Sequence, residues 1–250
     1  MNDWLDDLRT AVAFLTRLPM PHPAGPMPEN FVRAHRLFPV VGAAIGGAVG
    51  FLCLGLRATG LPDLAAAALA LGAGALLTGA LHEDGLADVA DGFGGGRDPA
   101  AKLEIMRDSR LGTYGALMLL VSFVAKLSAL AALPDAFVVK GLIAAHALAR
   151  GVLPFMAMSL AYARKDGLAA NAGRPDSSTV ATAGALALVI ALLVLPWREA
   201  LCAALAAAAC ALGMAWLAQR QIGGQTGDVL GGAEQLGETA ILLLLAATLA

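Results

Sequence analysis

The sequence has little charge and few aromatic side chains. Asp, Glu, Lys and Arg make up 14% of its 250 residues, whereas hydrophobic residues make up 58%. A soluble globular domain has about 25% charged and about 45–50% apolar residues, so this composition argues against a single soluble domain with a large core. The formal net charge of −2 provides no basic surface for nucleic acid. The three cysteines, Cys53, Cys202 and Cys210, lie in apolar runs, are odd in number and lack metal-ligand spacing, so they indicate neither a disulfide framework nor a zinc site.

Long apolar runs dominate the chain, and its mean hydropathy is +0.72. Because crossing a bilayer takes about 20 apolar residues in a helix, these runs indicate membrane spans. The predicted fold is therefore an all-α, polytopic membrane helix bundle of about six to seven transmembrane helices, with the lipid bilayer as a partner. The expected spans are Phe38–Leu56, Leu64–Leu81, Gly115–Leu133, Ala136–Ala161, Thr179–Leu195, Ala200–Ala218 and a short one, Leu236–Ala250.

Polar segments flank these spans within what is expected to be a single integral membrane domain, residues 1–250. Residues 1–37 comprise an expected interfacial helix over Trp4–Leu18, which is amphipathic, and a proline-rich lead-in. Residues 82–114 are expected to form a cytoplasmic catalytic loop. Residues 219–235 are expected to form a second cytoplasmic motif loop, rich in glycine.

Basic residues are distributed unevenly among the polar segments. Most of the 17 Lys and Arg residues fall in alternate segments, beginning with the N-terminal one. The segments between them hold only Arg57 and Arg198. Because basic residues gather in cytoplasmic loops, the sequence predicts a multi-pass protein of the cell inner membrane. Its N-terminus and its motif loops are predicted to be cytoplasmic.

The segment His82–Gly92 places several acids on one short piece of chain. If the preceding apolar run continues as a helix, Asp84, Asp88 and Asp91 lie at i, i+4 and i+7, on one face and over roughly 10 Å. Acids are disfavoured at the C-terminal end of a helix, so this arrangement favours a bound Mg²⁺ or Ca²⁺ over a solvated helix end. His82 is a candidate metal ligand, general base or interfacial residue.

A second polar segment follows a run of glycines. Asp98 and Pro99 have the pattern of an N-cap and first residue of a short helix. On this helix Glu104 and Asp108 share a face. Arg107 and Arg110 carry guanidinium groups suited to phosphate oxygens. The alternative is a surface ion pair between Glu104 and Arg107, contributing under about 1 kcal/mol.

Further candidate residues lie elsewhere in the chain. Asp228 is a second source of carboxylate, in a glycine-rich segment that also contains Gln225 and Thr226. His146 and Arg150 fall within the fourth expected span, and Lys126 falls within the third. Because an ionisable group at such depth costs at least about 2.5–3.5 kcal/mol unless it is paired or hydrated, these residues imply a polar cavity in the membrane domain.

Three of these motifs together resemble the cobalamin synthase family, the adenosylcobinamide-GDP ribazoletransferases. The resemblance implies an integral membrane enzyme that joins adenosylcobinamide-GDP to α-ribazole, or to its 5′-phosphate, and releases GMP. The principal motifs are His82–Gly92, Leu103–Thr113 and Gly223–Asp228, and shorter matches are Phe14–Pro19, Phe38-Pro39, Tyr162–Arg164 and Gly167-Leu168.

The resemblance turns the candidate residues into a predicted site for a pyrophosphate substrate and Mg²⁺. The predicted metal ligands are Asp84, Asp88, Asp91, Glu104 and Asp228. The predicted catalytic residues are His82, Asp84, Asp88, Asp91, Arg107, Asp108 and Arg110. The predicted substrate-binding residues are Gln225, Thr226, Asp228 and Arg150.

Two other functions fit parts of the sequence. A phospholipid-type alcohol phosphotransferase also uses helix aspartates, but its pattern needs an Ala-Arg pair shortly after the first Asp-Gly. Here Leu86, Ala87 and Asp88 follow Asp84-Gly85. A secondary transporter would use Lys126, His146 and Arg150 as a relay near the midplane, whereas the dense acids of this chain lie in segments expected to be cytoplasmic. The sequence contains no feature that sets an oligomeric state.

Overall fold

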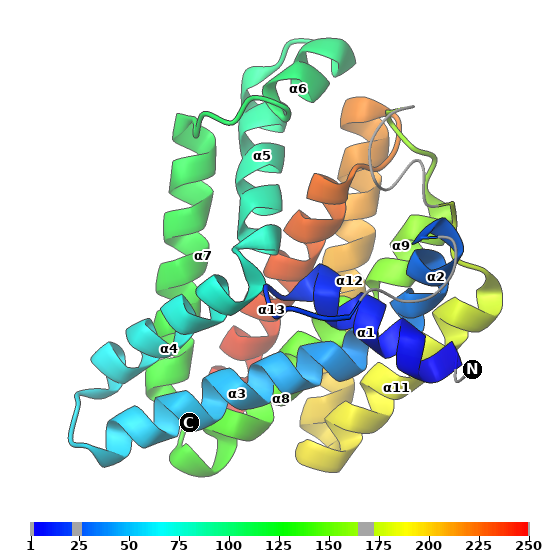
Figure 1. Cartoon of the computed structure of the whole chain (residues 1–250). Helices are drawn as coiled ribbons and strands as arrows, with labels where there is room; N and C mark the ends of the chain where they lie inside the picture. The colour runs from blue at the N-terminus through cyan, green and yellow to red at the C-terminus, as the bar shows by residue number, and fades with distance from the viewer. Residues whose placement is uncertain (1–2, 22–26, 165–172, 250) are drawn as a thin grey trace.

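The structure is a computed structural model, and it describes residues 3–21, 27–164 and 173–249. In these ranges the chain is built of helices (Figure 1). Gly167 and Leu168 of the family resemblance lie outside the described residues. The elements are α1 (Asp3–Leu15), α2 (Met27–Ala34), η1 (His35–Leu37), α3 (Phe38–Ala58), α4 (Asp63–Thr78), α5 (Leu81–Gly95), α6 (Pro99–Ile105), α7 (Thr113–Ala132), α8 (Asp135–Gly151), α9 (Leu153–Ser159), α11 (Ser177–Val194), α12 (Trp197–Ile222) and α13 (Gly227–Leu249).

The predicted all-α membrane bundle is confirmed. Within the described ranges, six helical segments are long and apolar enough to cross a membrane, and α4 with α5 adds a seventh if that bent pair counts as one span. The helices surround α8 and α13, whose apolar windows are about two-thirds buried, whereas those of α7, α11 and α12 are mostly exposed. Exposed apolar surface of this extent suits contact with lipid rather than water.

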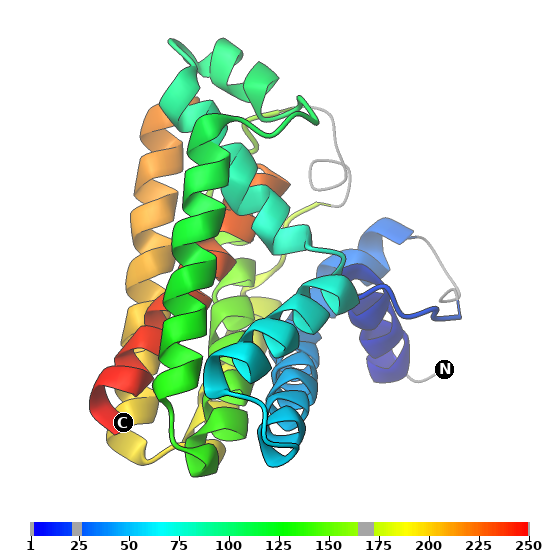
Figure 2. The same ribbon diagram turned by 90° about the vertical axis from the view of Figure 1, so that its left-hand side faces the viewer.

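The connections between the long helices gather at two ends of the bundle (Figures 1 and 2). At one end, Arg57 at the end of α3 pairs with Asp63 at 3.2 Å and Asp135 at 2.7 Å, joining two connections that are far apart in sequence. At the other end lie α6, the last turns of α5 and the C-terminal end of α12. This separation of the connections is what the alternating charge pattern predicted.

The largest departure from the expected spans is a break before the acidic motif. The span expected over Leu64–Leu81 ends at Thr78, and Gly79 and Ala80 take left-handed backbone angles, with φ of 68° and 54°. The chain turns by 90° there, and a new helix, α5, begins at Leu81. Glu83 and Asp84 therefore lie in the first turn of a helix, where acids are favoured. The prediction that one continuous helix carries these acids at its C-terminal end was wrong. The unfavourable position used to argue for a metal therefore does not apply to Asp84, although Asp91 lies toward the C-terminal end of α5.

Other boundaries also differ from those expected. The last span does not begin at Leu236 but at Gly227, and it forms a helix of 23 residues. Most of the motif loop expected over residues 219–235 is therefore helical, and only residues 223–226 connect α12 to α13. The catalytic loop expected over residues 82–114 holds α5 and α6. The span expected over Ala136–Ala161 comprises two helices, α8 and α9, which break at Val152.

The N-terminal helix packs on the bundle through charged as well as apolar contacts. It ends at Leu15 rather than Leu18. Asp7 on α1 is fully buried and pairs with Arg33 at 2.8 Å and Arg36 at 2.6 Å. These ion pairs fix α1 against α2 and η1.

Glycines spaced by four residues let α3 pack directly on α8. A Cβ atom at Gly46 would collide with the backbone of Leu142, and one at Gly50 would lie 2.7 Å from the Cα atom of Val139. Such contacts bring helix backbones close together, as small residues do in membrane bundles.

We expect Gly46→Ala to lower the thermal stability of the purified protein in detergent, because overpacking costs about 1–3 kcal/mol. Gly55→Ala is the matched control on the same helix, since a Cβ atom there meets nothing within 4 Å. Gly55→Ala should be neutral or slightly stabilising, because Ala favours a helix by up to about 1 kcal/mol over Gly. Equal melting temperatures for the two variants would contradict the close packing of α3 on α8.

Candidate functional site

Three carboxylates from two helices converge beside the α4–α5 break. Asp84 and Asp88 share a face of α5 at the predicted i, i+4 spacing. Asp228 lies in the first turn of α13. Asp88 interacts electrostatically with both Asp84 and Asp228. The structure therefore brings together acids that are about 140 residues apart in the sequence.

Glycine allows α5 and α13 to approach closely at this point. A Cβ atom at Gly85 would lie 2.9 Å from the backbone oxygen of Asp228 and 3.2 Å from the Cα atom of Gly231. A larger residue at position 85 would push α13 away. Asp228 therefore reaches the acidic face of α5 because the residue after Asp84 has no side chain.

A guanidinium group faces this acidic cluster from a third segment. The Nη2 atom of Arg164 lies 3.4 Å from Oδ2 of Asp228 and donates to the backbone oxygen of Leu103 at 3.3 Å. The sequence analysis gave Arg164 no role, although its motif was part of the family resemblance. Three carboxylates against one guanidinium leave an excess of negative charge.

Gln225 and Thr226 hold the segment that carries Arg164. The backbone of Gln225 pairs with Ala161 and Ala163, and its amide nitrogen donates to the backbone oxygen of Ala157 at 2.8 Å. The Thr226 hydroxyl donates to Asp228 at 3.1 Å. These predicted substrate-binding residues thus have structural contacts, yet Oε1 of Gln225 is buried and has no partner among the described residues.

Asp91 shares the face of Asp84 and Asp88, but its carboxylate is already engaged. It accepts backbone N–H groups from Gly112 at 2.7 Å and from Gly115 at 2.9 Å. Gly112 and Gly115 lie at the start of α7. Asp91 therefore caps α7, in keeping with the preference of helix N-termini for negative charge.

The helix α6 and its following turn lie near the C-terminal end of α5 (Figure 1). Asp108 and Arg110 form an exposed ion pair at 2.5 Å, and the guanidinium group lowers the pKa of Asp108 to about 2. Glu104 is exposed on α6, and Arg107 is exposed just after it. The predicted phosphate and metal roles of these four residues stay predictions.

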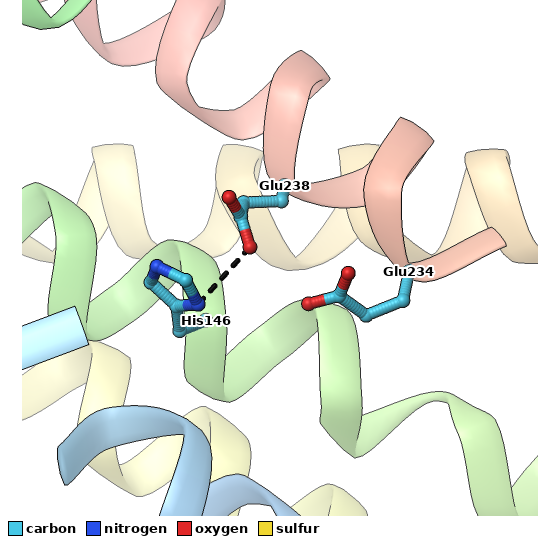
Figure 3. A group of neighbouring side chains, drawn as sticks. All are labelled: His146, Glu234 and Glu238. Atoms are coloured by element: carbon cyan, nitrogen blue, oxygen red, sulfur yellow. Dashed lines mark ion pairs between the residues drawn. The ribbon is translucent and has the colours of Figure 1, made fainter. Parts of the chain in front are cut away.

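A separate network of buried charges occupies the centre of the bundle. Arg150 on α8 is 1% exposed and pairs with Glu234 on α13 at 2.5 Å. Glu238, one turn later, pairs with His146 at 3.0 Å and with Lys126 at 3.2 Å. Figure 3 shows His146, Glu234 and Glu238 pointing toward one another from α8 and α13.

Neither glutamate of this network was predicted from the sequence. Lys126, His146 and Arg150 predicted a polar cavity, but Glu234 was expected in a loop and Glu238 had no predicted role. The signal was present, because two glutamates four residues apart in an apolar segment share one face of a helix. Recognising it required knowing that α13 begins at Gly227.

His82 belongs to both the network and the site. Its Nδ1 atom lies 3.3 Å from Arg150 and 3.4 Å from Glu234. Together with Asp84 and Asp228, His82 also lines a cavity of about 200 Å³.

Two groups of side chains have the composition of a cation site. The ligand atoms of His146, Glu234 and Glu238 lie within 4.8 Å of one another. However, Lys126 and Arg150 already supply positive charge to the two glutamates. The acidic cluster of Asp84, Asp88 and Asp228 keeps an excess of negative charge and offers only oxygen donors, the ligands that Mg²⁺ prefers. Its donors suit the predicted Mg²⁺ in type and charge, although among the described residues only the ligand atoms of the buried group lie within 4.8 Å of one another.

Comparison with known proteins gives consistent matches over nearly the whole chain. Residues 7–246 match a family described as cobalamin-5-phosphate synthase. A protein from Bradyrhizobium diazoefficiens, named adenosylcobinamide-GDP ribazoletransferase, is 46% identical over 242 residues, which cover 96% of this chain and 93% of that protein. A protein of the same name from Azorhizobium caulinodans is 44% identical over 249 residues, which cover 96% and 94%. No solved structure matches the chain.

Proposed function

Because the chain belongs to the cobalamin-5-phosphate synthase family, we propose that it is an adenosylcobinamide-GDP ribazoletransferase. It joins adenosylcobinamide-GDP to α-ribazole, or to α-ribazole 5′-phosphate, and releases GMP. The observation that supports a site for this reaction is the convergence of Asp84, Asp88 and Asp228 beside Arg164. A pyrophosphate substrate needs such a place, where a cation is bound and a guanidinium group faces the phosphates.

Asp84, Asp88 and Asp228 are the proposed ligands of Mg²⁺. When bound, this ion would neutralise the pyrophosphate and polarise its phosphoryl oxygens. Asp91 is left out of the proposed set because its oxygens accept the N–H groups of α7. Glu104 is left out because it lies on α6, whereas the three proposed ligands come from α5 and α13.

The reaction exchanges one phosphorus–oxygen bond for another. The oxygen of a ribose hydroxyl of α-ribazole forms a bond to the phosphorus atom that carries cobinamide. The anhydride bond between that phosphorus and GMP breaks, and GMP leaves with the electron pair of the bond. His82, Asp84 and Asp228 line the cavity where the hydroxyl arrives, and His82 or one of the aspartates can accept its proton. Arg164 offsets negative charge on the pyrophosphate as GMP leaves.

We further propose that this site faces the cytoplasm from the inner membrane. The acidic motif and α6 lie toward the end of the bundle that carries the basic segment of residues 97–110. Cytoplasmic loops carry the excess of Lys and Arg. Sealed inverted vesicles should therefore release GMP from added substrates, whereas sealed right-side-out vesicles should not.

The test of the proposed function is GMP release from adenosylcobinamide-GDP by the purified full-length chain. Release should require α-ribazole, stop in excess EDTA and return when Mg²⁺ is restored, because three carboxylates cannot bind a pyrophosphate without a cation. Transport of a corrinoid across the membrane of proteoliposomes, without GMP release, would instead support the alternative function of a secondary transporter. Release that continues in EDTA would contradict the metal site but not the reaction.

A further inference from the structure

The cavity beside the acidic cluster has a second wall made of aromatic rings. Asp84 and Asp228 come from α5 and α13, whereas α1, α2, η1 and α3 contribute the rings. The cavity volume of about 200 Å³ is below the roughly 300–1,000 Å³ of pockets for drug-sized ligands. It therefore suits one bicyclic ring rather than a corrin macrocycle. The aromatic wall consists of Phe14, Phe31, His35 and Phe38.

Each of the four rings packs against two of the others. Phe14 lies edge-on to Phe31, with centroids 4.7 Å apart, and stacks on Phe38 at 5.7 Å. His35 stacks on Phe38 at 4.4 Å, and its Nδ1 atom lies 2.9 Å from the backbone oxygen of Phe31. Offset and edge-to-face contacts are the preferred arrangements of aromatic side chains, so the wall is ordered before a ligand binds.

Buried ion pairs hold this wall in place. Asp7 on α1 binds Arg33 on α2 and Arg36 on η1, on either side of His35 in the sequence. The guanidinium group of Arg36 also lies 3.7 Å from the ring centroid of Trp4. The helices that carry the aromatic rings are thereby fixed to one another, which limits the entropy lost when a ligand is bound.

We propose that this aromatic wall, Phe14, Phe31, His35 and Phe38, binds the benzimidazole ring of α-ribazole. The proposal rests on the proposed function and specifies where the nucleoside lies in that site. Stacking on the wall directs the ribose toward Asp84 and Asp228, where phosphoryl transfer takes place. The unpaired Oε1 atom of Gln225, which also lines the cavity, would accept a hydrogen bond from a ribose hydroxyl.

The chemistry of the wall favours benzimidazole over the guanine of GMP. Guanine has several donors and acceptors on its edge, and burying them without partners is costly. Apolar side chains next to the rings, among them Leu153, Ala157 and Leu230, cannot satisfy those groups. A benzimidazole ring with methyl substituents has one ring-nitrogen acceptor and no exocyclic polar group, so it loses fewer hydrogen bonds than guanine against this surface.

Steady-state kinetics of GMP release by the full-length protein will test the assignment. Phe31→Leu keeps an apolar side chain but removes the ring. Because stacking of a base on an aromatic side chain contributes about 1–3 kcal/mol, KM for α-ribazole should rise about 5-fold or more. KM for adenosylcobinamide-GDP and inhibition by GMP should change much less. Phe51→Leu is the control, since Phe51 is 69% exposed on α3 and distant from the cavity lining.

A ligand series on the unmodified protein keeps the test independent of any folding defect in Phe31→Leu. For the unmodified protein, KM should be higher for the α-riboside of imidazole than for the α-riboside of benzimidazole. The ratio of these two KM values should be smaller in Phe31→Leu. Weaker GMP inhibition in Phe31→Leu, with KM for α-ribazole unchanged, would overturn the proposal and assign the wall to guanine. Unchanged kinetics in a stable Phe31→Leu variant would leave the wall a packing feature. No GMP release by the unmodified protein would instead contradict the proposed function.

Discussion

Asp84→Asn is expected to lower kcat for GMP release by at least about 100-fold. Removing a group that only orients a metal ligand commonly costs about 10–100-fold in affinity or activity, and Asp84 is a proposed ligand itself. The neutral amide keeps the size of the side chain but removes charge from the cluster that the guanidinium group of Arg164 faces. Rates should be measured over a range of Mg²⁺ concentrations. Asp228→Asn should show the same loss, together with a higher Mg²⁺ concentration for half-maximal rate.

Two other aspartates separate metal binding from general effects of charge. Asp135→Asn is the matched control, because Asp135 lies at the opposite end of the bundle with its side chain 71% exposed. It should leave both the rate and the Mg²⁺ dependence unchanged. Asp91→Asn should lower thermal stability because it weakens the cap of α7. The metal assignment would fail if Asp84→Asn retained near-normal activity at limiting Mg²⁺.

The acidic face could be predicted from the sequence because it depends only on local spacing. Asp84 and Asp88 share a helix face whether the helix continues the preceding span or begins anew. The break at Gly79 and Ala80 could not be predicted in the same way. Ala is a good helix former, and its left-handed backbone at Ala80 is imposed by the surrounding structure. The argument for a metal therefore has to rest on the convergence of α5 with α13.

That convergence depends on contacts between distant segments. The sequence marked Asp228 as a second carboxylate, but only the close approach at Gly85 places it beside Asp84. The sequence also favoured Arg107 and Arg110 as the basic half of the site, because they follow the acids closely along the chain. In the structure Arg164 faces the cluster, held there by the pairing of Gln225 with Ala161 and Ala163. Arg164 was not predicted because it is about 75 positions from the acids of α5 in the chain, whereas the predicted roles of Arg107 and Arg110 stay predictions.

Arg150→Met is expected to destabilise the protein more than any other single change considered. Arg150 is buried and contacts Glu234 at 2.5 Å and Glu238 at 3.7 Å. Breaking a buried ion pair by removing one partner commonly costs about 3–5 kcal/mol, because the other charge stays buried without compensation. The melting temperature in detergent should fall by about 10 °C or more. Arg198→Met, an exposed arginine at the end of the bundle, is the control and should melt normally.

A double variant distinguishes loss of charge balance from loss of packing. In the network, two cations, Lys126 and Arg150, pair with two carboxylates, Glu234 and Glu238. Removing Arg150 alone takes one positive charge from the network, whereas Arg150→Met combined with Glu234→Gln removes one charge of each sign. Because the double variant leaves neither charge of the Arg150–Glu234 pair buried without its partner, it should be more stable than Arg150→Met. If instead the double variant were the less stable of the two, Arg150 would contribute mainly through packing, and the network would not be organised by charge.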